Sequence, residues 1–269
     1  MGIRTDLNET MRDWDSLAAK DALWAILTDA GKVNGQWDIE EFMATGDAEI
    51  QTVMDHLASI SCHPMTNGAA LDFGCGVGRL TQAMSRRFTS CIGVDISREM
   101  IQRAVLLNQH EHCRYVANSD ARLPFADGSF SFIYSNIVLQ HVPRRLAAEY
   151  LREFVRVLTC DGVLVFGLQD SFAVSNASSL LFKVRQQLRI RSRIKRLLKI
   201  GSVDMKMHCM SEAIVREALG TAVVVDIQLT NTAAKNFNGR VKYMNSVPMT
   251  GYVGKQYCVT KLPRPSLTL

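Results

Sequence analysis

The strongest chemical signal in the 269-residue chain is a short loop in which Asp72 is followed by glycine at positions 74, 76 and 78. Glycine lacks a Cβ, so such a loop can turn sharply and place its backbone directly against a ligand. A helix that begins after the loop would point its free N–H groups and its positive end at the same space. A dinucleotide fingerprint would require glycine where the chain has Arg79, and the lysine of a phosphate-binding P-loop is missing.

Two further reactive side chains follow expected strands. Asp95 ends the apolar run 91–94 and lies 21 residues beyond Gly74, where an acid can accept hydrogen bonds from both hydroxyls of a ribose. His141 follows the run 130–134, and an imidazole with a near-neutral pKa can take a proton from an attacking hydroxyl. The alternative is that His141 only shapes the pocket, and His208 is a second candidate for the base.

Five segments follow one another in the order and spacing of a known family: 70–81, 93–97, 118–130, 135–143 and 158–164. They resemble the motifs of class I S-adenosylmethionine-dependent methyltransferases, in the methyltransferase type 11 domain family. The resemblance covers roughly residues 66–170 and is closest to the group that includes ubiquinone and menaquinone biosynthesis enzymes. Several motifs in order, at the family's spacing, are far more specific than a glycine loop alone.

This resemblance implies a site for S-adenosyl-L-methionine, which would leave as S-adenosyl-L-homocysteine, and no metal. Asp72 and the backbone of the glycine loop would hold the methionine end, and Asp95 would hold the ribose. Asp120 would accept from the adenine amino group, and Asn136 would lie near the methionine tail or the transferred methyl. For Asp95 and Asp120 the alternative roles are helix capping and loop solubility. The full set of residues implied at the cofactor is Asp72, Gly74, Cys75, Gly76, Asp95, Ile96, Met100, Asp120, Ala121 and Asn136.

From residue 47 onward, apolar runs alternate with amphipathic helical segments. This alternation is typical of βαβ units, so we expect an α/β fold with a Rossmann-like, doubly wound, mainly parallel sheet of seven strands. The predicted strands are 69–73, 91–94, 114–117, 130–134, 163–168, 221–229 and 252–262.

Outside this core the sequence predicts two additions to the fold. Residues 1–46 are expected to form a helical N-terminal cap, and residues 47–269 the methyltransferase domain, with an insertion at 171–209 before the sixth strand. The cap has two open interpretations, packing against the core and covering a ligand pocket. Within it, Asp38 is expected to start a helix, with Trp37 and a later phenylalanine forming a hydrophobic staple.

The insertion carries a concentrated positive charge. The chain has a net charge of +5, and the segment from Lys183 to Lys199 holds eight basic residues and no acidic one. Leucines and isoleucines between them predict a basic amphipathic helix. Three interpretations stay open: an interfacial helix on an anionic membrane or a lipid-linked substrate, an electrostatic funnel for an anionic small substrate, and a solvated helix face.

Composition narrows the class of protein. The chain is 47% hydrophobic and 21% charged, as expected for a soluble globular protein, and no apolar run is long enough to cross a bilayer. The seven cysteines show no C-x-x-C spacing, which indicates reduced thiols and a cytoplasmic location. His110 and His112 beside Cys113 are interpreted as a polar loop and not as a metal site.

The sequence therefore favours a methyltransferase that acts on a small molecule, with a hydroxyl oxygen of a sugar, a lipid-linked compound or a secondary metabolite as the acceptor. His141 would be the catalytic base. The alternatives are a membrane-surface module built around the basic segment and an RNA methyltransferase. Nucleic acid is disfavoured because residues 135–138 are Ser-Asn-Ile-Val, where many enzymes that methylate nucleic-acid amino groups have an N/D-P-P-Y/F tetrad.

Overall fold

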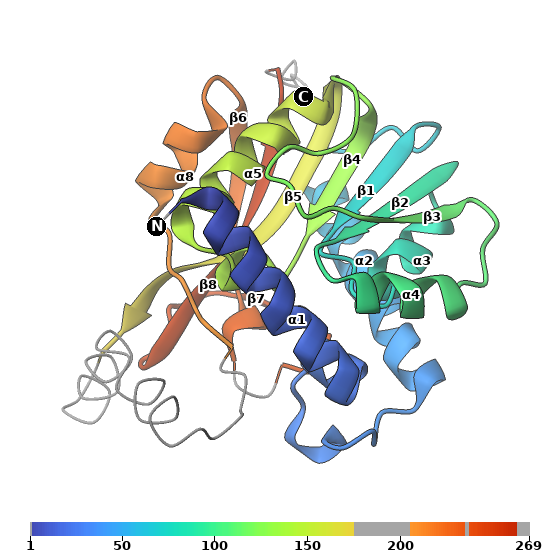
Figure 1. Ribbon diagram of the computed structural model, residues 1–269. Helices are drawn as coiled ribbons and strands as arrows, with labels where there is room; N and C mark the ends of the chain where they lie inside the picture. The colour runs from blue at the N-terminus through green and yellow to red at the C-terminus, as the bar shows by residue number, and fades with distance from the viewer. Residues whose placement is uncertain (1, 175–204, 235–236, 263–269) are drawn as a thin grey trace.

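The protein is described by a computed structural model over residues 2–174, 205–234 and 237–262. A twisted sheet forms its middle layer, with helices on both faces (Figure 1). The strands are β1 (Ala69–Phe73), β2 (Ser90–Asp95), β3 (Cys113–Ala117), β4 (Phe130–Ser135), β5 (Leu158–Ala173), β6 (Val223–Thr230), β7 (Tyr243–Met244) and β8 (Gly251–Thr260). The helices are α1 (Ile3–Ile26), α2 (Ile39–Ser59), α3 (Arg79–Ser85), α4 (Arg98–Leu106), α5 (Arg144–Val157) and α8 (Glu212–Leu219), with short 3-10 turns η1 (Ala30–Lys32), η2 (Leu139–His141) and η3 (Asn231–Ala233).

The sheet has the order β3-β2-β1-β4-β5-β8-β6-β7. Strands β1 to β5 pair in parallel, while β8 pairs antiparallel with both β5 and β6. The α/β, Rossmann-like, mainly parallel architecture expected from the sequence is confirmed. The predicted count of seven strands is wrong, because a two-residue strand, β7, pairs with the end of β6. A pair this short has no hydrophobic periodicity, so the sequence gives no signal for it.

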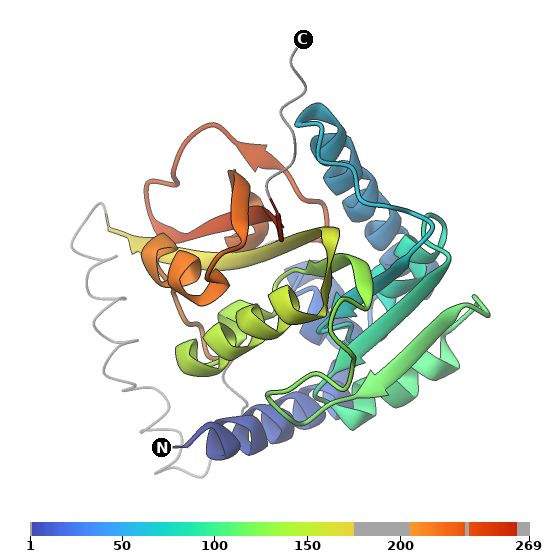
Figure 2. The same cartoon turned by 90° about the horizontal axis from the view of Figure 1, so that it is seen from above.

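Helices cover both faces of the sheet because each is apolar on one side only (Figure 2). One buried cluster joins α2 and α3 to one face through residues such as Val53 and Met84. A second cluster joins α5 and α8 to the opposite face through residues such as Phe154 and Val215. Strand β4 lies between the two layers and is buried along its whole length, as expected of a central parallel strand.

The start of α2 follows the predicted signal. Oδ1 of Asp38 accepts a hydrogen bond of 2.9 Å from the backbone N–H of Glu41. The rings of Trp37 and Phe42 meet edge to face with centroids 5.5 Å apart, so the hydrophobic staple is also confirmed. The boundary placed between residues 46 and 47 falls within α2, and β5 extends through Ala173, into the range assigned to the insertion. The basic segment itself lies outside the described residues.

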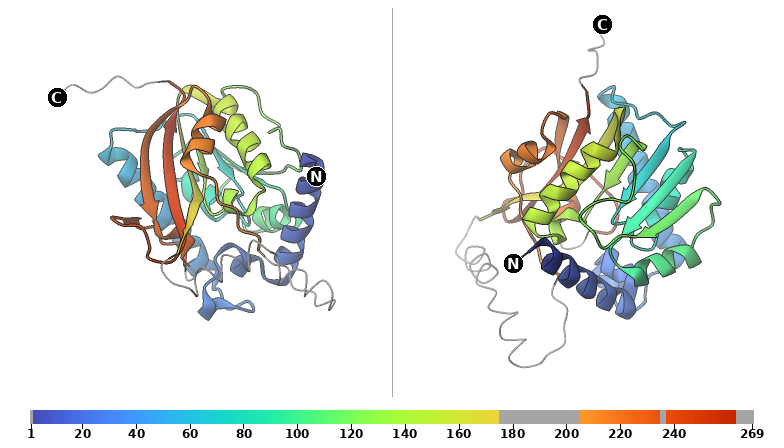
Figure 3. Two further views of the ribbon diagram at one scale, coloured as in Figure 1. Left: turned by 90° about the vertical axis from the view of Figure 1, so that its left-hand side faces the viewer. Right: turned by 45° about the horizontal axis from the view of Figure 1, so that its top comes forward.

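Helix α1 crosses the edge of the sheet where the parallel strands end (Figures 1 and 3). It contacts α4 and α5. A buried cluster that includes Leu17, Ala18 and Ala22 of α1 holds it against Met100 of α4 and Val77 of the glycine loop. The carboxyl ends of β1, β2 and β4 therefore face a space that helix α1 covers.

Candidate active site

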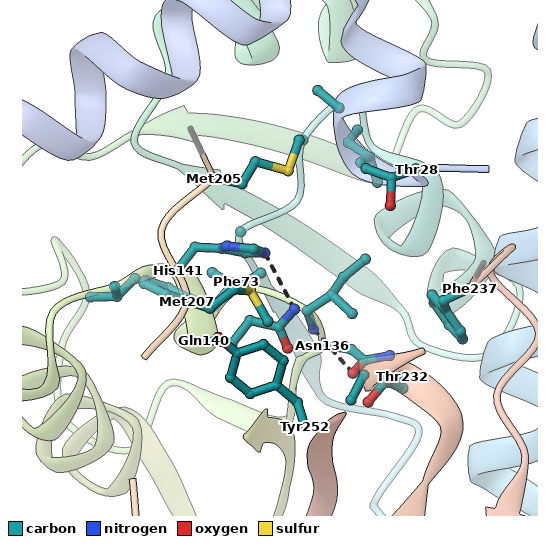
Figure 4. A pocket seen from close by; sticks show the side chains of 18 of the residues that line it. Thr28, Phe73, Asn136, Gln140, His141, Met205, Met207, Thr232, Phe237 and Tyr252 are labelled. Carbon is teal, nitrogen blue, oxygen red and sulfur yellow. Dashed lines mark hydrogen bonds between the residues drawn. The ribbon is translucent and has the colours of Figure 1, made fainter. Parts of the chain in front are cut away.

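A cavity of about 1010 Å³ lies between α1 and the carboxyl ends of the parallel strands. Ligand sites of open α/β sheets form at this edge, and the volume is at the upper end of the range for small-molecule pockets. The loops after β1, β2 and β4 line one part of it, and the ends of β5, β6 and β8 line another. Figure 4 shows side chains from these separate segments pointing into one space.

The glycine loop makes part of the cavity wall with backbone atoms alone. Gly74 has a φ of +77°, and a Cβ there would stand 2.2 Å from a methyl group of Val138. Gly76 has a φ of +52°, and a Cβ there would stand 2.5 Å from Cδ1 of Ile26 in α1. Gly74 requires glycine because the backbone conformation and the space both exclude a side chain, and Gly76 is favoured as glycine by its positive φ. The loop thus brings a bare backbone and the start of α3 to the cavity.

Asp95 holds the glycine loop in place and can still accept further hydrogen bonds. Its Oδ2 accepts from the Gly76 N–H at 2.9 Å, and its Oδ1 accepts from the Ser97 N–H at 2.8 Å. Burial raises the pKa of Asp95 to about 6, against the lowering effect of these hydrogen bonds. The group is therefore mainly a carboxylate at neutral pH. Because a carboxylate has about four lone-pair sites, two hydroxyl donors of a ligand can still bind it.

Asp72 lies behind the glycine loop and does not line the cavity. Its side chain is fully buried, and Oδ2 accepts a hydrogen bond of 2.6 Å from the Thr81 hydroxyl of α3. Burial raises the pKa of Asp72 to about 7. In this position the carboxyl group ties the loop to the first turn of α3, and a direct contact with a ligand stays a prediction.

The other implied cofactor residues divide into two groups. Those that line the cavity are Gly74, Cys75, Gly76, Asp95, Ile96, Met100 and Asn136. Asp120 is exposed and, like Ala121, is not part of the lining. Asn118 of the same loop does line it, and its Nδ2 donates to the Asp120 carbonyl at 2.9 Å. This loop therefore lines the cavity through Asn118, a residue of the recognised motif for which the sequence alone indicates no role.

Asn136 is held by a buried polar group that we name the Glu49 cluster: Glu49, Arg79, Tyr134 and Asn136. The Glu49 carboxylate accepts from Asn136 Nδ2 at 2.7 Å, from the Tyr134 hydroxyl at 2.9 Å and from Arg79 at 2.8 Å. The side chains of Glu49 and Arg79 are 0% and 2% exposed, so the pair is an ion pair in the interior. Sequence reasoning missed Glu49, because nothing in α2 marks one buried acid among several exposed ones.

The backbone after Asn136 has an unusual conformation. Ile137 lines the cavity with a φ of +54°, a region that β-branched residues rarely adopt. Its N–H donates to Oδ1 of Asn136 at 3.1 Å. The Glu49 cluster thus orients the Asn136 amide, and that amide in turn stabilises a strained residue at the cavity wall.

His141 lies at the end of η2 and lines the same cavity. Its Nδ1 is 2.9 Å from the Lys206 backbone carbonyl oxygen, and its Nε2 is 3.3 Å from Nε2 of Gln140. The ring of Trp14, from α1, meets it edge to face at 5.5 Å between centroids. Burial lowers the pKa of His141 to about 4, so the imidazole is neutral at physiological pH. The structure does not bring His208 into this lining.

The part of the cavity beyond His141 is lined mainly by uncharged side chains. Those that are aromatic or contain sulfur are Trp14, Phe172, Met205, Met207, Phe237, Met244 and Tyr252. Across the described lining the ionisable groups are Arg79, Asp95, His141, Cys75, Tyr150 and Tyr252, and Arg79 is paired with Glu49. The described residues thus give this part of the cavity mainly apolar surface.

Metal and membrane features are absent from the part of the chain that the structure describes. No group of three or more His, Cys, Asp or Glu side chains is placed to bind a metal ion among residues 2–174, 205–234 and 237–262. Within the same ranges no helix has the length and hydropathy needed to span a bilayer.

The fold, the glycine-walled cavity and Asp95 at the end of β2 are those expected of an S-adenosylmethionine-dependent methyltransferase. Residues 71–166 match the methyltransferase domain family. This range holds the recognised motifs from β1 to β5, so the resemblance found in the sequence is confirmed.

Three proteins illustrate the similarity. An uncharacterised methyltransferase of Bacillus subtilis, YcgJ, is 36% identical over 106 residues, which is 38% of this chain and 40% of that protein. A demethylmenaquinone methyltransferase of Staphylococcus haemolyticus is 32% identical over 107 residues, 38% of this chain and 44% of that protein. The chain thus spans less than half the length of these relatives. The structure of an S-adenosylmethionine-dependent methyltransferase from Leishmania major matches 95% of this chain and 83% of its own with a TM-score of 0.59 and 13% identity, so it supports the fold alone.

Proposed function

We propose that the protein transfers a methyl group from S-adenosyl-L-methionine to a hydroxyl oxygen of a small, uncharged acceptor, and releases S-adenosyl-L-homocysteine. The observation that carries the proposal is a single cavity with two unlike parts. One part has the bare glycine loop, Asp95 and Asn118, and the other has a neutral histidine among apolar side chains.

The first part fits the cofactor. The backbone of Gly74–Gly76 faces the methionine end, and the Asp95 carboxylate has lone pairs left for the ribose hydroxyls. Ile96 and Met100 provide apolar surface for the adenine. The bound cofactor supplies an electrophilic methyl group on a sulfonium sulfur.

His141 is suited to accept the proton of the acceptor hydroxyl. Because a carbonyl oxygen can only accept, the 2.9 Å contact with Lys206 places the ring proton on Nδ1 and leaves a lone pair on Nε2. In the transfer, the bond between the sulfonium sulfur and the methyl carbon breaks and a bond between that carbon and the acceptor oxygen forms. The hydroxyl proton moves to Nε2 of His141.

The lowered pKa limits which hydroxyls suit this base. With a pKa of about 4, His141 is a weak proton acceptor. A phenolic or enolic hydroxyl, whose pKa is about 10 or lower, is a better match than an aliphatic alcohol. We therefore include an acidic hydroxyl on an apolar ring system in the proposal.

The proposal also covers the cellular compartment and the binding partners of the protein. The odd number of cysteines and their scattered spacing in the sequence support a reducing, cytoplasmic setting. Among the described residues, the mainly uncharged lining beyond His141 supports a neutral acceptor over an anionic one. Contact of the basic segment with an anionic membrane or a lipid-linked acceptor is a subsidiary proposal, tested by liposome flotation with the arginines at 185, 189, 191 and 193 neutralised.

Calorimetric titration with S-adenosylmethionine and S-adenosylhomocysteine tests the first step. We expect micromolar-range binding to the folded protein and at least a tenfold loss in Asp95→Ala. Formation of S-adenosylhomocysteine is then measured against a panel of phenols, enols, sugars and amines. Absence of cofactor binding to the folded protein would overturn the proposal, and turnover with amines alone would overturn the choice of oxygen.

The His141 assignment has its own test on any acceptor that is turned over. His141→Ala should lower kcat at least a hundredfold, while binding of S-adenosylhomocysteine stays within threefold of wild type. Turnover of His141→Ala near the wild-type value across the pH range would remove the base assignment and leave alignment of the acceptor as the main source of catalysis.

A further inference from the structure

The Lys206 carbonyl sets the direction of a chain of hydrogen bonds that runs through two glutamines. Because Nδ1 of His141 donates to this carbonyl, Nε2 of the neutral ring can only accept. The atom of Gln140 that lies 3.3 Å away must therefore be the donor, its amide nitrogen. Figure 4 shows this contact at the centre of the cavity.

The same logic continues to Gln169 of β5. With the Gln140 nitrogen turned toward His141, its Oε1 faces away and accepts a hydrogen bond of 2.8 Å from Nε2 of Gln169. Gln169 is fully buried and Gln140 is 6% exposed, so the contact between the two amides lies in the interior. The backbone carbonyl at Lys206 thus determines which way both amides point.

The result is a donor and an acceptor side by side in the cavity wall. The amide N–H of Gln140 and the lone pair of His141 lie on residues that both line the cavity. Their mutual contact of 3.3 Å is longer than a typical hydrogen bond, so a ligand that satisfies both groups better can replace it.

We propose that Gln140 and His141 together form a hydroxyl-binding pair, in which Gln140 donates to the acceptor oxygen while His141 accepts its proton, and that Gln169 is the residue that positions Gln140. This inference rests on the proposed function and adds two specificity-determining residues to it. Nothing in the sequence alone marks Gln140 or Gln169 as a site residue.

The pair discriminates among functional groups by hydrogen-bond direction. A hydroxyl both donates and accepts, so it satisfies both members. An ammonium group only donates and has no lone pair for the Gln140 N–H. A carboxylate only accepts and would face the lone pair of His141. A hydroxyl also leaves no charge in this apolar part of the cavity, where an unpaired charge is costly to bury.

Three probes that share the naphthalene ring system test the pair. These are 2-naphthol, which donates and accepts, 2-methoxynaphthalene, which only accepts, and 2-methylnaphthalene, which does neither. Each is titrated calorimetrically into protein saturated with S-adenosylhomocysteine at pH 7.5. In the wild type we expect 2-naphthol to bind at least tenfold more tightly than 2-methylnaphthalene, with 2-methoxynaphthalene in between.

The variants separate the roles of the residues. In Gln140→Leu and His141→Ala the preference for 2-naphthol over 2-methylnaphthalene should fall to threefold or less, while 2-methylnaphthalene binds as in the wild type. Gln169→Leu should weaken the preference in the same way, and Gln169→Glu, which can only accept when ionised, should fail to restore it. Gln51→Leu, the same substitution on the exposed face of α2 and outside the cavity lining, is the matched control and should keep the tenfold preference.

Two outcomes distinguish failure of this inference from failure of the proposed function. If S-adenosylhomocysteine does not bind, the proposed function fails before any probe is added. If S-adenosylhomocysteine binds, but the three probes bind equally or undetectably, or Gln140→Leu keeps the wild-type preference, the hydroxyl-binding pair is overturned alone. A second readout is the nitrogen NMR spectrum of labelled histidine, in which His141 should be the Nδ1–H tautomer. The Nε2–H tautomer would overturn the pair.

Discussion

Removal of one charge from the Glu49 cluster should destabilise the whole domain. In Glu49→Gln the amide oxygen can still accept from Tyr134 and Asn136, which lie 2.9 and 2.7 Å from the carboxylate. The guanidinium of Arg79, at 2.8 Å and 2% exposed, would lose its counter-charge in the interior. The substitution therefore isolates the effect of an uncompensated buried charge.

The expected magnitude follows from this burial. Breaking a buried ion pair by removal of one partner costs about 3–5 kcal/mol, whereas exposed pairs contribute roughly 1 kcal/mol or less. With an m value of about 2 kcal/mol per molar, the urea midpoint of Glu49→Gln should fall by about 2 M. The matched control is Glu99→Gln, which breaks an exposed pair with Arg103 (side chains 37% and 40% exposed) and should change stability by about 0.5 kcal/mol or less.

Urea unfolding followed by circular dichroism at pH 7.5 measures these values. A second variant, Glu49→Gln combined with Arg79→Met, removes the stranded charge and should recover about 1–2 kcal/mol relative to Glu49→Gln. The reasoning is refuted if Glu49→Gln loses less than about 1 kcal/mol, or if the double variant is less stable than the single one.

Three further predictions concern the cavity. Because burial raises the pKa of Asp95 to about 6, wild-type affinity for S-adenosylhomocysteine should fall as the pH is lowered through 6 and the carboxylate takes up a proton. Calorimetry from pH 5 to 8 measures this fall. Asp95→Asn should bind at least tenfold more weakly and should not show the pH dependence. Gly74→Ala should lower the free energy of unfolding by about 1–3 kcal/mol and abolish cofactor binding, because its Cβ would lie 2.2 Å from Val138. Thermal unfolding with and without S-adenosylhomocysteine measures both effects. Gly74→Ala combined with Val138→Ala should recover part of the stability. Lys206→Met keeps the carbonyl that binds His141 but loses the ion pairs of Lys206 with Glu9 and Asp13 of α1. Release of S-adenosylhomocysteine, measured by stopped flow, should therefore become several-fold faster and lose its salt dependence. Lys206→Arg should behave like the wild type.

The core of the fold was predictable because its signals are local. Each parallel strand is a short apolar run next to a glycine or a helix start, and Ser97 caps α4 by accepting from the Met100 N–H, as its position predicted. The short strand β7 was missed because its pairing with β6 depends on contacts between residues distant in sequence. Periodicity within a segment cannot report such a contact.

The candidate site was predictable only in part, for a related reason. Motif positions such as Gly74 and Asp95 line the cavity, but Asp120 is exposed and Asp72 lies behind the loop. Burial and the direction of a side chain depend on the tertiary structure, which residue spacing does not encode. The same applies to Glu49, which is 30 residues from Arg79 in the chain and forms an ion pair with it in the interior.

Helix α1 makes the roof of the cavity from one continuous piece of chain. Thr10, Trp14, Ala25 and Ile26 line the cavity, while the glycine loop and Asp95 that face them come from a different part of the sequence. Ile26 packs against Gly76, but substitutions at Thr10 and Trp14 can change the size and polarity of the cavity and keep that contact. The amino-terminal half of α1 is thus a segment in which sequence changes can alter the cavity while the motif residues of β1 and β2 stay the same.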